Sequence, residues 1–142
     1  MAGEPLPLEL RFSLRPGSVF YSQLRELHSA EPHFFIVANR DPLGTNLLLI
    51  TIVTSQIDKV RIRNRERPDT VVEITPAEYA EFTKHSAIDC NVIFEKPVSD
   101  LAEMVRQKHV RYHIDLPAPL LEKIRAAIKA SPVVEDELKA LL

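Results

Sequence analysis

Two histidines lie at positions where proton transfer could take place. His28 is in a polar connection after a predicted strand, and His85 directly precedes another predicted strand. An imidazole suits acid–base catalysis because its ordinary pKa lies close to neutral. Each position also has a structural interpretation, His28 as part of a solvated loop and His85 as a surface residue after a short helix. His33 begins a strand and is interpreted as structural.

A second pair of histidines and a single cysteine could support other chemistry. His109 and His113 are four residues apart, a spacing that binds metal on a helix. The intervening residues Val110-Arg111-Tyr112 favour a strand, on which the two rings stand about 13 Å apart. We therefore expect no metal and no cofactor. Cys90 is predicted to be a small apolar residue of the core, and a nucleophilic pair with His85 is the alternative.

The segment from residue 59 to 67 alternates cations with other residues. The cations are Lys59, Arg61, Arg63, Arg65 and Arg67. On an extended chain all five point the same way along roughly 26 Å. Such a stripe can follow the phosphates of a nucleic acid, with an affinity that depends on salt. A charged edge strand that prevents aggregation is the alternative interpretation.

The elements that must position these residues follow from apolar periodicity and turn residues. Alternation and β-branched runs predict strands at residues 8–14, 18–24, 33–39, 46–55, 71–74, 86–94 and 110–114. The capping box Thr75-Pro76-Ala77-Glu78 predicts a short helix to about Phe82. Ser99 is predicted to cap a helix over residues 100–107, and apolar spacing predicts helices at 120–130 and after Ser131-Pro132.

The fold class predicted from this order is a mainly β protein with helices, in which short helices are inserted late. The 142 residues fit one domain, with residues 1–7 as a flexible lead-in and residues 117–142 as C-terminal helices. Only three glycines and one cysteine are present, which excludes a dinucleotide fingerprint and a disulfide framework. No apolar run approaches a membrane span, so we expect a cytoplasmic protein without a membrane partner.

Four segments suggest a more specific fold. They read Arg15-Pro16-Gly17-Ser18-Val19-Phe20-Tyr21, Pro32-His33-Phe34-Phe35-Ile36-Val37, Ile50-Thr51-Ile52-Val53-Thr54-Ser55 and Ser86-Ala87-Ile88-Asp89-Cys90-Asn91-Val92-Ile93. Their order and spacing resemble those of the PemK/MazF-like toxin superfamily. The resemblance covers about residues 15–130 and implies a small SH3-like barrel that pairs as a homodimer.

The resemblance also implies an activity and a partner. Members of this family with known activity cleave single-stranded RNA without metal, and an antitoxin holds them inactive. In that reaction a ribose 2′-OH attacks the adjacent phosphate, so a base, an acid and cations are needed. On this basis Thr54 and Ser55 would position the phosphate, His28 or His85 would transfer the proton, and Arg25 would supply a cation with the stripe.

Two departures from the family pattern support an alternative function. The family places an Arg-Pro pair at its second strand, where this chain has Glu31-Pro32-His33. The family also commonly has Arg and Asp around the position of Cys90, where this chain has Asp89 and Asn91. The alternative is a barrel without catalysis that binds a peptide or RNA as a dimer. A structural interaction protein that dimerises through the same barrel is a third interpretation.

Overall fold

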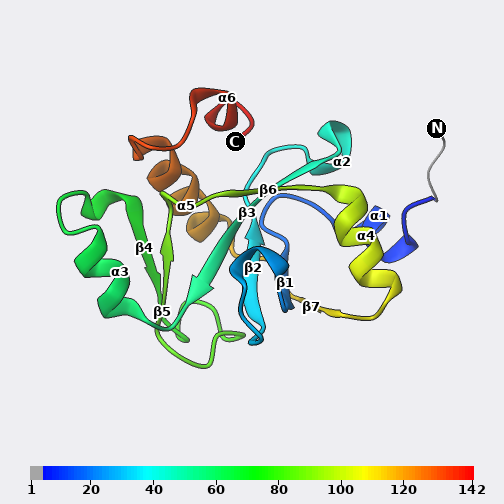
Figure 1. The fold of residues 1–142 in the computed structure, drawn as a ribbon, viewed down its shortest axis with the longest axis horizontal. Coiled ribbons are helices and arrows are strands. Elements are labelled where there is room, and N and C mark those ends of the chain that lie inside the picture. Colours follow the sequence, from blue (N-terminus) through cyan, green and yellow to red (C-terminus); the bar gives the residue numbers. More distant parts are fainter. Residues whose placement is uncertain (1–4) are drawn as a thin grey trace.

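The computed structural model describes residues 5–142 and has a mixed β+α fold (Figure 1). The strands of this part of the chain are β1 (Val19–Ser22), β2 (His33–Val37), β3 (Leu47–Thr54), β4 (Val71–Ile74), β5 (Ser86–Asp89), β6 (Phe94–Pro97) and β7 (Val110–His113). Its helices are α1 (Leu8–Ser13), α2 (Pro42–Thr45), α3 (Ile57–Arg63), α4 (Val98–Arg106), α5 (Ala118–Ala130) and α6 (Asp136–Lys139), with short 3₁₀ turns η1 (Arg25–Leu27) and η2 (Pro68–Thr70). The predicted class, strands with inserted and C-terminal helices, is confirmed.

All strand pairs of the sheet are antiparallel. The strands follow the order β4-β5-β3-β2-β1-β7, and β6 pairs with the first half of β3. The second half of β3 pairs with β5 at Val53–Ile88 and Thr54–Ala87. Within residues 5–142 no ladder joins β4 to β7, so the sheet is open and does not form a closed barrel.

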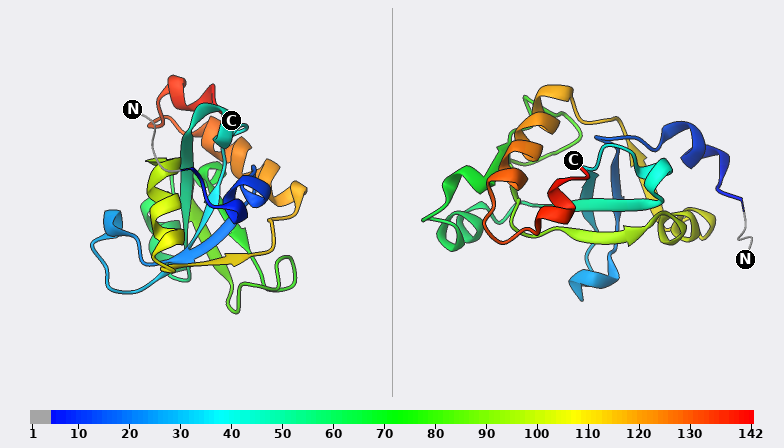
Figure 2. Two further views of the ribbon diagram at one scale, coloured as in Figure 1. Left: turned by 90° about the vertical axis from the view of Figure 1, so that its right-hand side faces the viewer. Right: turned by 90° about the horizontal axis from the view of Figure 1, so that it is seen from above.

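The open sheet has two apolar cores. One lies between α5 and the β4–β5 end of the sheet, where Ile124 of α5 is fully buried with Ile74 and Ile88. The other lies under α1 and α4, where Leu10 and Leu101 pack with Phe35. Viewed from above, α3 and α5 lie on opposite sides of β4 and β5 (Figure 2). The side occupied by α3 is called the α3 face below.

The first predicted strand is instead the helix α1. The pattern of residues 8–14 alternates, but only Leu10 and Leu14 are buried, while Leu8 and Phe12 are 63% and 78% exposed. Buried positions four residues apart fit a helix, and a strand would have placed all four on one face. The prediction of a strand at residues 8–14 was therefore wrong.

The prediction that the cations of residues 59–67 share one extended face was also wrong, because residues 57–63 form the helix α3. Val60 and Asn64, four residues apart, are the buried positions of this segment. Residues two apart in a helix point in different directions around its axis, whereas residues two apart in a strand point to the same side. Lys59, Arg61, Arg63, Arg65 and Arg67 therefore do not share one extended face.

Three further local predictions were only partly right. The Thr75 backbone N–H donates to Glu78 Oε1 at 3.0 Å as in a capping box, but the chain continues as turns and not as a helix. Residues 86–94 form two strands, β5 and the start of β6, with a turn between them. The helix α4 begins at Val98, so Ser99 lies inside it and is not its cap. Of the predicted lead-in 1–7, residues 1–4 lie outside the described residues.

Truncation of Ile124 should test the packing of α5 against the sheet. The side chain is fully buried, so Ile124→Ala should lower the free energy of unfolding by about 2–5 kcal/mol. Ile62→Ala is the matched control because Ile62 is 65% exposed on α3. Urea unfolding followed by circular dichroism measures both. Equal, small effects of the two substitutions would contradict the placement of α5.

Candidate active site

Arg61, Glu73 and His85 form an ion-paired cluster on the α3 face. Glu73 Oε1 accepts hydrogen bonds from Arg61 Nη2 at 2.5 Å and is 3.0 Å from His85 Nε2. The other oxygen, Oε2, accepts a bond from Arg61 Nε at 2.8 Å. The side chains of Arg61, Glu73 and His85 are 54%, 29% and 44% exposed, so a ligand can reach all three.

Strand register explains why these residues meet. Glu73 of β4 pairs with Ala87 of β5, and Ala87 pairs with Thr54 of β3. Paired residues of antiparallel strands point to the same side, so Thr54 and Glu73 share the α3 face about 10 Å apart. His85 precedes Ala87 by two residues and therefore points to this side as well. The helix α3 lies over the same side and carries Arg61 to Glu73.

The electrostatics of the cluster keep Glu73 ionised. The hydrogen bonds from Arg61 hold the pKa of Glu73 below its ordinary value, against the opposing effect of partial burial, and His85 lowers it further. A carboxylate can accept a proton, an imidazole can donate one, and a guanidinium can stabilise charge on a phosphate. The three groups needed for transfer at a phosphodiester therefore meet at Glu73, which contacts both Arg61 and His85.

Thr54 and Ser55 end the strand beside this cluster. Thr54 Oγ1 accepts a hydrogen bond from the Gln56 backbone N–H at 3.1 Å, which closes the turn into α3. Thr54 thus has a structural role, and it also belongs to the row that contains Ala87 and Glu73. Ser55 is exposed at the end of that strand.

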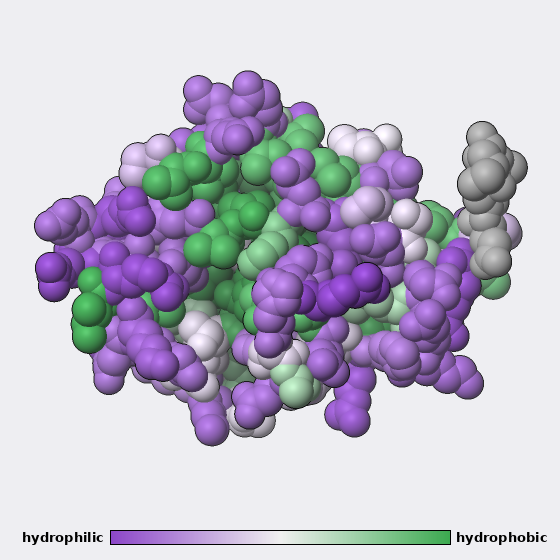
Figure 3. All heavy atoms as spheres, in the orientation of Figure 1, coloured by the Kyte–Doolittle hydropathy of each residue, from purple (hydrophilic) through white to green (hydrophobic). Residues whose placement is uncertain are grey.

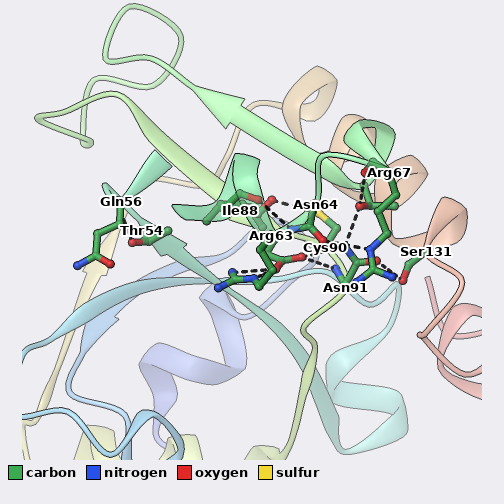
Figure 4. A network of polar contacts seen from close by, with 12 residues as sticks. Thr54, Gln56, Arg63, Asn64, Arg67, Ile88, Cys90, Asn91 and Ser131 are labelled. Carbon is green, nitrogen blue, oxygen red and sulfur yellow. Dashed lines mark hydrogen bonds and ion pairs between the residues drawn. The ribbon is translucent and has the colours of Figure 1, made fainter. Parts of the chain in front are cut away.

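A second carboxylate, Asp89, holds Arg63 on the same side of the sheet. Asp89 Oδ2 accepts bonds from Arg63 Nε at 3.0 Å and Nη2 at 2.9 Å. Asp89 is only 8% exposed, whereas the Arg63 side chain is 57% exposed. Figure 4 shows Arg63 lying between Thr54 and Asn91. Arg63 is therefore a cation that the nearly buried Asp89 carboxylate holds in place and that solvent can still reach.

Asn91 extends this contact into a buried network (Figure 4). Its amide Nδ2 donates to Thr70 Oγ1 at 2.7 Å and to Asn64 Oδ1 at 3.0 Å. Its oxygen accepts a bond from Ser131 Oγ at 2.6 Å. The network joins α3, η2 and the end of α5. Burial disfavours the charge of Asp89, but bonds from Asn64, Asn91 and Arg63 outweigh it and keep the pKa of Asp89 below its ordinary value.

The other predicted cations have looser surroundings. Arg67 Nε donates to Asn64 Oδ1 at 3.1 Å. Lys59 and Arg65 are exposed, and their side chains make no hydrogen bond or ion pair with any other residue of the described chain. These two side chains are therefore available to a ligand at α3.

Arg25 and His28 lie away from the cluster, in the loop between β1 and β2. This loop projects from the sheet (Figure 2), and both residues are exposed. They line a groove together with residues of α4 and β7. The structure therefore brings His85 and Arg61 together but places Arg25 and His28 at a separate groove. His28 has a positive φ of 50° at the end of η1.

The nucleophile alternative at Cys90 is contradicted by its surroundings. Cys90 is fully buried, and burial together with Asp89 raises the pKa of its thiol to about 12. A thiolate is therefore not accessible at neutral pH. Among residues 5–142 no three His, Cys, Asp or Glu side chains gather as a metal site.

Sequence reasoning missed Glu73 and the role of Asp89. The residues Val72 and Ile74 are buried, so alternation along β4 turned Glu73 to the other side of the sheet. That alternation was visible in the sequence, but its partners Arg61 and His85 are each 12 residues away. Only the pairing of β4 with β5 and the docking of α3 bring them together.

No protein-family profile matches the chain, and no curated protein matches it either. The resemblance to PemK/MazF-like toxins therefore stays a prediction. In the part of the chain that the structure describes, the helices are too short or too polar to cross a membrane.

Asp89→Asn should destabilise the protein in a pH-dependent way. The folded pKa of Asp89 lies below its ordinary value of 3.8, so ionised Asp89 stabilises the fold above that pH, and the contribution is lost as the pH falls through the folded value. We expect a loss of about 1–3 kcal/mol at pH 7 that shrinks below pH 4. Urea unfolding at pH 7 and at pH 2 measures this loss, and Asp69→Asn, a substitution at an exposed aspartate, is the control. A loss that is equally large at pH 2 would contradict the role of the Asp89 charge.

Proposed function

We propose that the protein cleaves single-stranded RNA at the α3 face, with Arg61, Glu73 and His85 as its catalytic residues. The observation that carries the proposal is the Glu73 carboxylate, which contacts both the His85 imidazole at 3.0 Å and the Arg61 guanidinium at 2.5 Å on an exposed surface. These side chains supply a base, an acid and a cation for one phosphodiester. The reaction needs no metal ion because the chain itself supplies all three.

The proposed step is an internal transesterification. Glu73 accepts the proton of a ribose 2′-OH, and the 2′-oxygen forms a bond to the adjacent phosphorus. Arg61 stabilises the negative charge of the pentacovalent phosphorus. The bond from phosphorus to the 5′-oxygen breaks as protonated His85 donates a proton to that oxygen. The products are a 2′,3′-cyclic phosphate and a free 5′-hydroxyl. In this step Glu73 gains one proton and His85 loses one, and the exchange of one proton with water by each side chain restores both for the next turnover.

The surroundings of the cluster support a polyanionic substrate. Lys59 of α3 and Arg65, which follows the helix, have no hydrogen-bond or ion-pair partner in the described chain, and Arg63 keeps more than half of its side chain exposed. These cations can hold phosphates on either side of the scissile bond. In this proposal the hydroxyls of Thr54, the last residue of β3, and of Ser55, which follows it, would contact the same RNA backbone.

The proposal extends to the biological setting implied by the PemK/MazF-like resemblance. The protein would act in the cytoplasm as the toxin of a type II toxin–antitoxin pair. It would work as a homodimer and be held inactive by an antitoxin protein.

A second candidate function, RNA or peptide binding without cleavage, is favoured by one observation. Both Glu73 oxygens and two of the Arg61 donors are already satisfied by each other. Such a pair also ties α3 to β4 with no substrate present. The two candidates differ in whether loss of Glu73 removes an activity or only stability.

Glu73→Gln and His85→Ala should each lower the rate of RNA cleavage at least about 100-fold, because each removes one proton-transfer group. The measurement is mapping of new ends on a long single-stranded RNA in the presence of chelator, with the terminal groups identified. The wild-type rate should fall in acid only below the ordinary glutamate value of 4.5, since the pKa of Glu73 is lowered.

The control for this experiment is Glu66→Gln, an exposed glutamate beyond α3. It should cleave as the wild type does. Circular dichroism and urea unfolding should show that each variant is folded. Cuts that persist at the same sites and rates in both Glu73→Gln and His85→Ala would contradict a catalytic role of Glu73 and His85. Intact RNA with a folded wild-type protein would favour the binding function.

A further inference from the structure

A groove outside the cluster is built from three parts of the chain. Its walls are the β1–β2 loop, the helix α4 and the residues that lead into β7. Charged side chains of both signs line it: the basic residues are Arg25, Lys96, Lys108 and Arg111, the acidic ones are Glu26, Asp100 and Glu103, and two histidines, His28 and His109, lie among them. Glu73 and His85 do not line it, so the groove is separate from the proposed catalytic residues.

Internal bonds hold the walls of this groove in place. Lys96 Nζ donates to Glu26 Oε2 at 2.8 Å, and the Lys96 side chain is only 10% exposed, so the loop is tied to β6. Ser22 Oγ donates to the His109 carbonyl at 2.7 Å, which ties β1 to the turn before β7. The groove is therefore formed before any ligand arrives, which lowers the cost of binding.

Each acidic residue of the groove has a basic side chain as its ion-pair partner, although Glu26 and Asp100 share the single ammonium group of Lys96. Burial disfavours the charge of Glu26, but the bond from Lys96 outweighs it and holds the pKa of Glu26 below its ordinary value. Asp100 lies 3.8 Å from the same Lys96. Glu103 accepts bonds from Arg106 at 3.2 Å and Gln107 at 3.0 Å.

Three other cations of the groove form no ion pair in the described chain, although the charge of Arg25 contributes to the lowered pKa of Glu26. Arg25, Lys108 and Arg111 are exposed, and within residues 5–142 their side chains make no hydrogen bond or ion pair. The groove therefore carries an excess of positive charge although the chain as a whole has a net charge of −2. Such a local excess attracts polyanions.

The lining favours a nucleic-acid backbone over a protein. Protein interfaces depend on large apolar or aromatic anchors. None of the large apolar side chains that are exposed in the described part of the chain lines this groove. In Figure 3 the surface over α4 is mixed, with hydrophilic side chains beside paler ones, and the largest apolar patch lies nearer the centre of this view.

We propose that this groove is a second binding site for the phosphate backbone of single-stranded RNA, held by Arg25, Lys108 and Arg111. This inference rests on the proposed function in one respect, namely that the RNA strand bound in the groove is the one cleaved at Glu73. The β1–β2 loop stands between the groove and α3 (Figure 2), so a strand of several nucleotides must pass this loop to occupy both. The groove then secures long substrates and contributes nothing to very short ones.

The test compares two double charge reversals by fluorescence anisotropy with an uncleavable 2′-O-methyl RNA of 20 nucleotides. Arg25→Glu with Arg111→Glu changes the groove, and Arg11→Glu with Lys129→Glu makes the same change in net charge at exposed positions elsewhere. The groove variant should bind at least 30-fold more weakly. Its plot of log affinity against log salt should be shallower by about 1.4, since each phosphate contact in a single strand contributes about 0.7.

Three outcomes would overturn the proposal. The first is equal weakening by the two double variants, and the second is no weakening by either. The third is competition by a poly-glutamate peptide as effective as that by unlabelled RNA, which would assign the groove to an acidic protein segment. Circular dichroism confirms that both variants are folded.

Cleavage assays separate this proposal from the proposed function. The groove variant should raise the KM for a 20-nucleotide RNA at least tenfold and leave that for a four-nucleotide RNA unchanged. If the wild type cleaves neither RNA but the groove variant alone loses binding, the proposed cleavage fails and the second site stands. If cleavage occurs and both lengths respond alike, the second site fails and the cleavage stands.

Discussion

The pairing of β3 on both of its edges is the constraint on which the rest of the structure depends. On one edge its central residues bond to β2, and on the other edge it bonds first to β6 and then to β5. Leu48, Leu49 and Ile50 of this strand are at most 1% exposed and contribute to both apolar cores. Since β3 belongs to both halves of the sheet, the strands remain hydrogen-bonded from β4 to β7. The helices α4 and α5 can therefore each cover a separate core of one continuous sheet.

This division places two kinds of charged surface on one molecule. The end of β3 brings Thr54 into register with β5 and β4, so the α3 face acquires Glu73 with its two partners. The other half carries the groove, whose wall depends on the buried contact between Lys96 and Glu26. The α3 face depends on carboxylates that fix cations, since Asp89 holds Arg63 as Glu73 holds Arg61. A fixed cation loses little entropy on binding an anion, which suits the α3 face to phosphates. The groove instead offers exposed cations that form no ion pair within residues 5–142.

Strands with strong local signals were predictable from the sequence. The apolar run of β3 and the short β-rich runs of β1 and β2 were placed within a few residues, as was the apolar stripe of α5. The errors fell on short segments with ambiguous patterns. Residues 8–14 and 59–67 both alternate, yet each buries residues four apart and forms a helix. Local alternation does not decide between these states, because burial against distant elements selects the helix.

The sequence by itself determined the types of residue available for chemistry and the elements with strong periodicity. It named His85, Arg61 and Thr54 as separate candidates and grouped His28 and Arg25 with them. Only the tertiary structure decided that His85 and Arg61 meet at Glu73, and that the other pair lines a different groove. The physical reason is that contacts between residues far apart in the chain depend on strand pairing and helix docking. Those interactions are set by the burial of the whole core and not by any local segment.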